Sequence, residues 1–131
     1  MFVDASVITA AMLREPGSDA VLLRLKGSLH RSTSPVAVWE TTVAITRVLD
    51  MAVTASRVQV HDYPKLAAIE ILPITAEIGD LALDAFDRYG KGRHPARLNM
   101  GDCFAYTCAW HYRQPLLYKG DDFALTDIET A

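Results

Sequence analysis

Short apolar runs alternate with longer amphipathic segments along this chain. The short runs predict β-strands at Met1–Asp4, Arg31–Ser34, Ile69–Ile74, Leu116–Lys119 and Asp127–Ile128. The longer segments carry apolar residues three and four positions apart, which is the spacing of one face of an α-helix. They predict helices at Ala5–Arg14, Ser18–Gly27, Pro35–Met51, Thr54–Pro64, Thr75–Tyr89 and Met100–Arg113.

Residues that favour helix ends bound these segments. N-terminal caps are expected at Asp4 or Ser6, Ser34, Thr54, Thr75 and Asn99. Pro35 suits the first position of its helix, which has no use for an N–H group there. Pro64 is expected to end or bend the fourth helix, and Gly90 to close the fifth.

Strands that alternate with helices predict an α/β fold, with a parallel sheet covered by helices on both faces. Ligands of such sheets bind beyond the carboxyl ends of the strands. Asp4 lies at the end of the first predicted strand, and Asp121 and Asp122 follow the strand at Leu116–Lys119. The fold class therefore directs attention to these three acids.

Composition narrows the class of protein. The chain has 131 residues, 50% of them hydrophobic and 22% charged, as in an ordinary globular domain. No apolar run approaches the ~20 residues of a membrane span, and the N-terminus has no leader pattern, so a cytoplasmic protein without a membrane partner is expected. The net charge of −3 excludes a generally basic coat for nucleic acid. Cys103 and Cys108 fit no zinc pattern and are expected to be buried free thiols.

Acids far apart in the sequence are the candidate chemistry: Asp4, Glu40, Asp102, and Asp121 or Asp122. Several have a structural explanation. Asp4 can cap the first helix, Asp102 can satisfy N–H groups of the first turn after Asn99, and an acid after Gly120 suits a turn.

Glu40 is harder to explain as structural. Its helix neighbours three and four positions away are apolar, namely Val36, Val43 and Ala44. Burial of an ionised carboxylate is costly unless it is paired. A salt bridge to Arg47 on the same helix remains the alternative.

A divalent cation would explain the acids together. Two carboxylates about 4 Å apart repel by about 4 kcal/mol at an effective dielectric constant of about 20. Oxygen ligands favour Mg²⁺ or Mn²⁺, and either metal can activate water against a phosphodiester. The basic loop Lys91–Arg97 and the nearby Lys119 could bring a phosphate to such a site, or be solvated surface.

Four stretches resemble the PIN-domain nucleases, in particular the VapC toxins of bacterial toxin–antitoxin pairs. They are Phe2–Ser6, Val38–Thr41, Leu98–Tyr106 and Pro115–Phe123. The stretch around Asp102 is the most specific, and Tyr89–His94 strengthens the match to one VapC subgroup. The resemblance covers essentially the whole chain, so a single PIN domain over residues 1–131 is expected.

The resemblance implies a three-layer sandwich with a central, mostly parallel sheet of four to five strands. It implies a toxin ribonuclease of a VapBC-type pair, which cleaves RNA with water activated by Mg²⁺ or Mn²⁺. The expected partners are RNA, a cognate VapB-type antitoxin and a second copy of the chain. An antitoxin groove is implied on Ala5–Gly27 and the third helix, with the apolar residues Met12, Leu13, Leu22 and Leu29.

The resemblance also implies roles for single residues. Asp4 and Asp102 would bind metal directly, and Glu40 would bind it directly or through water. Ser6 would hydrogen-bond a ligand or water. The fourth acid departs from the family pattern, because Gly120 occupies the usual position; Asp121 is favoured, and Asp122 is the alternative.

The substrate-binding candidates are basic side chains and Ser6: Ser6, Lys91, Arg93, Arg97 and Lys119. Large aromatic residues at helical spacing are expected in the core or a dimer contact, namely Trp39, Phe86, Phe104, Tyr106 and Trp110. A PIN nuclease of RNA processing and a non-enzymatic binding module remain alternatives. A phosphatase with Asp4 as nucleophile is disfavoured, because Ser6 stands where a second Asp would be expected.

Overall fold

The structure is a computed structural model that describes residues 1–131. Four short parallel strands form the centre of the molecule. The strands are β1 (Phe2–Val3), β2 (Arg31–Thr33), β3 (Ile69–Ile71) and β4 (Leu116–Leu117). Their order across the sheet is β3-β2-β1-β4, and β1 lies between its partners with Phe2 opposite Ser32 and Leu116. The carboxyl ends of β1 and β4 therefore lie side by side.

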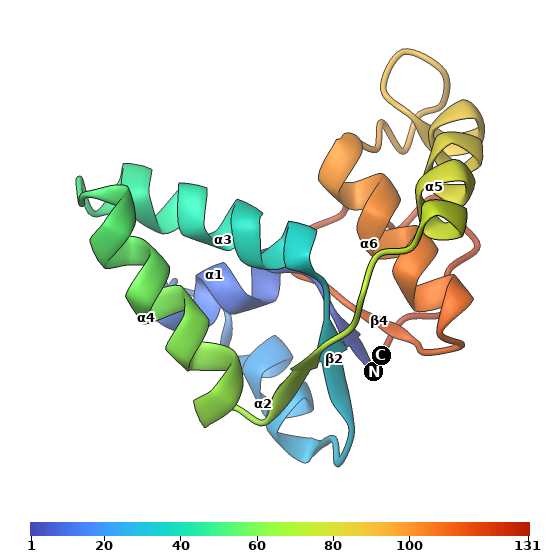
Figure 1. The fold of residues 1–131 in the computed structure, drawn as a ribbon. Coiled ribbons are helices and arrows are strands. Elements are labelled where there is room, and N and C mark those ends of the chain that lie inside the picture. The colour runs from blue at the N-terminus through green and yellow to red at the C-terminus, as the bar shows by residue number, and fades with distance from the viewer.

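Six helices surround the sheet: α1 (Ala5–Leu13), α2 (Asp19–Gly27), α3 (Pro35–Val48), α4 (Val53–Leu66), α5 (Ala76–Tyr89) and α6 (Met100–His111). Helices α1 to α4 lie on one side of the sheet and α5 and α6 on the other (Figure 1). The first turns of α3 lie beside α6, where the two sides meet. The predicted α/β sandwich with a parallel sheet is confirmed.

Alternate strand residues serve the two sides, as the two-residue period of a strand requires. Phe2 and Leu116 pack into the core formed with α5 and α6. Val3 and Leu117 pack into the core formed with α1, α2 and β3. The pairing of two adjacent strands in the same register thus divides the apolar residues between two separate cores.

Several predicted element ends are confirmed by capping contacts. Ser34 accepts a hydrogen bond from the N–H of Ala37, and Thr75 from that of Ile78. Asn99 and Asp102 form a reciprocal capping box at the start of α6. Gly90 ends α5, although it lies in an extended conformation and not in the left-handed one.

Other predicted ends are wrong. Helix α4 begins after Ala52, without a side-chain cap, so Thr54 lies inside the helix. Pro64 falls in the last turn of α4, and the helix continues to Leu66. Asp127–Ile128 forms no strand; Thr130 makes the isolated bridge to Leu116. The pattern marked these elements but not the residues at which tertiary contacts stop them.

The aromatic residues divide between core and surface. Tyr106 is buried, whereas Trp39 and Trp110 are each 60% exposed, so these two lie outside the core, and the alternative of a dimer contact stays a prediction. Cys103 and Cys108 are buried free thiols, as predicted. None of the helices combines the length and apolar character that a membrane crossing requires.

Candidate active site

Asp4 directly follows β1 and is only 6% exposed. Its Oδ2 atom accepts hydrogen bonds from the N–H of Ser6 at 2.9 Å and from the Ser6 hydroxyl at 2.6 Å. The Ser6 oxygen in turn accepts the N–H of Lys119 at 3.0 Å. Asp4 is therefore both the cap of α1 and a group fixed to the segment that follows β4. Its capping role does not exclude a role in the site.

Asp102 has a similar double position at the first turn of α6. Its Oδ2 atom accepts the N–H of Asn99 at 2.8 Å, and its own N–H donates to the Asn99 side chain at 3.0 Å. These contacts occupy one carboxylate oxygen of Asp102. The other carboxylate oxygen, Oδ1, makes no hydrogen bond within the protein and is free to bind a ligand.

Glu40 reaches the same place from α3. Its carboxylate lies directly against Gly101 in the first turn of α6. It makes no ion pair with Arg47, so the alternative of a helix-internal salt bridge is wrong.

The charges of these acids act on one another. Burial, together with the negative charges of Asp4 and Asp102, raises the pKa of Glu40 to about 7. Burial also raises the pKa of Asp102 to about 6; the hydrogen bond from Asn99 opposes this, and the charges of Asp4 and Asp122 add to it. Burial raises the pKa of Asp4, partly offset by its bonds from Ser6.

Of the two acids after β4, Asp122 and not Asp121 is the one whose charge affects the pKa values of Asp4 and Asp102. Its negative charge contributes to the raised pKa values of both Asp4 and Asp102. Asp121 lines the outer cavity beside them, and its carbonyl oxygen accepts the N–H of Ala124 in a turn. Asp122, the alternative named from the sequence, is thus the acid after β4 whose charge acts on Asp4 and Asp102, and the fourth ligand remains a prediction.

The four carboxylates fit a divalent cation by charge and by chemistry. The ion pairs of the molecule involve other acids, so no basic side chain neutralises Asp4, Glu40, Asp102 or Asp122. Hard oxygen ligands of this kind suit Mg²⁺ or Mn²⁺. No three acidic, histidine or cysteine side chains are gathered closely enough to enclose an ion as they stand. The argument for a cation therefore rests on uncompensated negative charge and not on a preformed cage.

The predicted basic residues differ in their surroundings. Lys91 and Arg97 line the cavity that also contains Asp102, Asp121 and Asp122. Neither basic side chain takes part in an ion pair. They lie where a phosphate approaching the acids would meet them.

Arg93 and Lys119 are occupied elsewhere. Arg93 pairs with Asp87 at 2.6 Å and lies over the ring of Phe86. The Lys119 ammonium pairs with Glu15 at 2.6 Å, in a cavity shared with Ser6 and Glu40. Both would have to leave an acidic partner before they could bind a phosphate.

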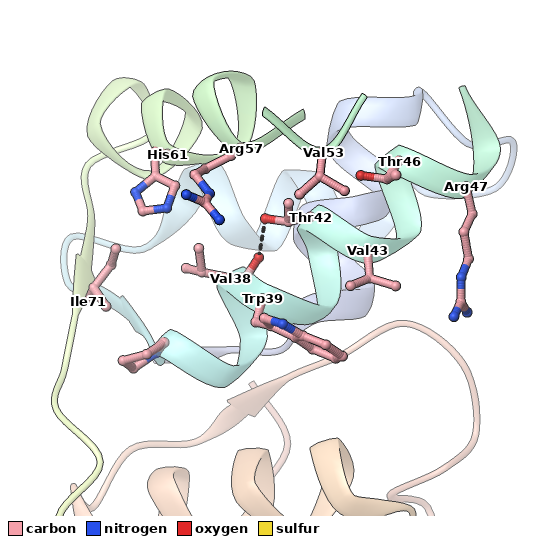
Figure 2. Close-up of a pocket in the computed structure, with 11 residues that line it drawn as sticks. Val38, Trp39, Thr42, Val43, Thr46, Arg47, Val53, Arg57, His61 and Ile71 are labelled. Atoms are coloured by element: carbon pink, nitrogen blue, oxygen red, sulfur yellow. Dashed lines mark hydrogen bonds between the residues drawn. The ribbon is translucent and has the colours of Figure 1, made fainter. Parts of the chain in front are cut away.

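Sequence reasoning missed an apolar groove between α3 and α4 (Figure 2). It encloses about 720 Å³, and its lining consists of apolar, small polar and basic side chains without an acid: Pro35, Val38, Trp39, Thr42, Val43, Thr46, Arg47, Val53, Arg57, His61 and Ile71. Of the antitoxin groove expected on Ala5–Gly27 and the third helix, the third helix lines this groove and Ala5–Gly27 does not. Met12, Leu13 and Leu22 there are partly buried against the cores, and Leu29 is isolated and 94% exposed.

The chain is similar in sequence to known proteins over nearly its whole length. The profile of the PIN domain matches residues 1–129. The chain belongs to the PIN domain family, and within it to the VapC ribonucleases. It is 37% identical to a VapC ribonuclease of Rhizobium meliloti (strain 1021), over 97% of this chain and 98% of the relative. It is 35% identical to ribonuclease VapC30 of Mycobacterium tuberculosis, over 99% and 97% of the two chains.

Two solved structures share the fold at low sequence identity. Mycobacterium tuberculosis VapC20, a toxin that cleaves the sarcin–ricin loop, superposes with a TM-score of 0.77 at 15% identity, over 99% of this chain and 97% of that one. A toxin–antitoxin complex from Klebsiella pneumoniae has a TM-score of 0.69 at 14% identity, over 96% and 92%. The family predicted from the sequence motifs is confirmed.

Proposed function

We propose that this VapC protein is an endoribonuclease that depends on Mg²⁺ or Mn²⁺ and acts as the toxin of a toxin–antitoxin pair. One observation carries the proposal. Four carboxylates from separate parts of the chain share one region without a basic partner, and burial and mutual repulsion raise the pKa values of Asp4, Glu40 and Asp102. A folded protein has little structural use for such an arrangement, whereas a cation would relieve it.

In this proposal Asp4, Asp102 and Asp122 hold the cation directly, and Glu40 holds it through a water molecule. Asp122 takes the place for which Asp121 was the first choice, because its charge is the one that reaches Asp4 and Asp102. Ser6 orients Asp4 through its two hydrogen bonds and has no remaining proton for a ligand. When bound, the cation would supply positive charge for the phosphate and make a water molecule a stronger nucleophile.

The protein side chains supply orientation and proton exchange. Glu40 has a pKa of about 7 without metal, near the value at which a carboxyl group exchanges protons best at neutral pH. It is therefore our candidate for the general base. Lys91 and Arg97 would attract the RNA backbone by charge, with smaller contributions from the paired Arg93 and Lys119.

The α3–α4 groove is our candidate for the antitoxin site. It offers apolar surface around Trp39 and Val43, and its charged residues are Arg47 and Arg57. A partner segment that presents apolar side chains flanked by carboxylates would complement both features. The toxin–antitoxin assembly of the Klebsiella pneumoniae neighbour supports a protein partner for this fold.

Metal dependence is the direct test of the proposed activity. The purified chain should cleave an RNA panel that includes a sarcin–ricin loop oligonucleotide, only when Mg²⁺ or Mn²⁺ is present. Calorimetry should show Mn²⁺ binding that Asp4→Asn weakens at least tenfold, by analogy with the loss of a metal-site group. Full cleavage in EDTA, or equal Mn²⁺ affinity of the variant, would contradict the proposal.

A further inference from the structure

The Glu40 carboxylate lies directly against Gly101. The residue is buried in the first turn of α6. A Cβ atom built on Gly101 would overlap both carboxylate oxygens of Glu40 and the carbon that joins them. No other side chain meets this hypothetical atom among its nearest neighbours. Any substitution at position 101 therefore acts first on Glu40.

The backbone of α6 does not itself require a glycine here. The glycines with positive φ are Gly17, Gly92 and Gly120, so Gly101 has a conformation that any residue can adopt. Alanine is the better helix former by about 1 kcal/mol. What glycine provides at this position is space for the carboxylate of a residue on another helix.

The start of α6 also attracts a carboxylate. The N–H groups of Asn99 and Asp102 are satisfied within the capping box, and that of Cys103 by the Asn99 carbonyl oxygen. The N–H groups of Met100 and Gly101 make no hydrogen bond within the protein. Such unpaired first-turn donors, with the helix dipole, favour negative charge nearby.

We propose that Gly101 is a positioning residue for Glu40. Its missing side chain lets Glu40 lie against the first turn of α6, where the carboxylate comes under the influence of Asp4 and Asp102. With alanine at position 101, Glu40 would have to turn away from the other acids. The catalytic consequence rests on the proposed function, whereas the packing of Glu40 on Gly101 does not.

The test compares Gly101→Ala with Gly79→Ala. Gly79 lies inside α5 with open space around its hypothetical Cβ, so it reports the effect of alanine in a helix alone. We expect Gly101→Ala to lower Mn²⁺ affinity and RNA cleavage about 10- to 100-fold, the usual cost of losing an orienting contact at a metal site. Gly79→Ala should leave both within about twofold of the original protein.

Rescue distinguishes positioning from general damage. Aspartate is one methylene shorter than glutamate, so Glu40→Asp should restore part of the Mn²⁺ affinity in the Gly101→Ala background. In the original protein, which has Gly101, Glu40→Asp should instead lower the Mn²⁺ affinity. Unchanged Mn²⁺ affinity of the Gly101→Ala protein would overturn the proposal. An equal loss of Mn²⁺ affinity on Glu40→Asp in the Gly101→Ala protein and in the original protein would also overturn it.

A stability cycle without metal or RNA separates this inference from the proposed function. Melting temperatures in EDTA would be measured for Gly101→Ala, Glu40→Ala and the double variant. We expect Gly101→Ala to lower the melting temperature when Glu40 is present and to leave or raise it when Glu40 is replaced by alanine. Additive effects would refute the Gly101–Glu40 contact, even if the chain proves to be a metal-dependent nuclease.

Discussion

The acidic site and the α3–α4 groove are neighbouring regions that differ in chemistry: the first has unpaired negative charge, and the second has exposed apolar surface. The site gathers negative charges, and no basic side chain pairs with them. The groove exposes apolar surface with basic residues at its edge and no acid. A small cation would complete the first region, whereas only a chain segment could cover the second. In our proposal, catalysis and partner binding therefore use different chemistry on adjoining surfaces.

Helix α3 contributes to both regions. Trp39 and Val43 are four positions apart and line the groove (Figure 2). Glu40 is one position from Trp39, a rotation of about 100° around the helix, and lies against Gly101 on α6. Side chains within one turn of α3 thus point to the two proposed sites in different directions. Substitutions on one face should leave the function of the other intact.

The largest expected effect breaks the acidic site. Asp102→Asn removes one of the uncompensated charges and keeps the shape of the side chain, so we expect RNA cleavage to fall by more than about 100-fold. Asp62→Asn, at an exposed acid of α4 paired with Lys65, is the matched control and should retain activity. Initial cleavage rates of the purified variants measure both effects. Comparable loss in the two variants would remove the special role of the site.

The second effect breaks the groove. Trp39→Ala removes an exposed aromatic side chain, and aromatic residues dominate the binding energy of many interfaces, so antitoxin affinity should fall about 30-fold. Trp110→Ala is the control, because Trp110 is equally exposed, at 60%, but lies on α6. Binding to the antitoxin encoded beside the toxin gene can be measured by calorimetry. Unchanged affinity of the Trp39 variant would place the partner elsewhere.

A third substitution pair sharpens the composition of the site. Asp122→Asn should weaken Mn²⁺ binding about tenfold, whereas Asp121→Asn should change it by less than about threefold. The difference is expected because only Asp122 acts on the charges of Asp4 and Asp102. Calorimetric titration of both variants provides the comparison. A larger loss for Asp121 would restore the choice made from the sequence.

The smallest effect is a dependence of stability on pH. The folded pKa values of Glu40 and Asp102, about 7 and about 6, exceed their ordinary values of 4.5 and 3.8. The folded state therefore binds more protons than the unfolded state between these values, and the metal-free protein should lose stability as pH rises from about 4 to about 7. We expect the melting temperature in EDTA to fall by a few degrees over this range.

Two controls refine the pH experiment. Glu40→Gln should flatten the decline, because it removes the group with the higher pKa. Saturating Mn²⁺ should raise the melting temperature more at pH 8 than at pH 5, since binding requires ionised carboxylates. A melting temperature in EDTA that is constant or rises between pH 5 and 7 would disagree with the charge crowding at the site.

Much of this molecule follows from local rules that can be read along the chain. The apolar periodicity indicated the helices and the main strands, and Ser34, Thr75 and Asn99 marked helix starts. The four motif stretches, of which the one around Asp102 is the most specific, predicted the family. These features can be read from the sequence because caps and helix faces depend on residues within a few positions of one another.

Only the tertiary structure decided which distant groups meet. Glu40 lies against Gly101, the Ser6 hydroxyl accepts the N–H of Lys119, and the Lys119 ammonium pairs with Glu15. The effect of the Asp122 charge on Asp102 and the groove between α3 and α4 have the same origin. Each depends on how whole helices and the loop after β4 pack against the sheet. Such packing is a sum of many weak contacts across the molecule, and no short stretch of sequence records it.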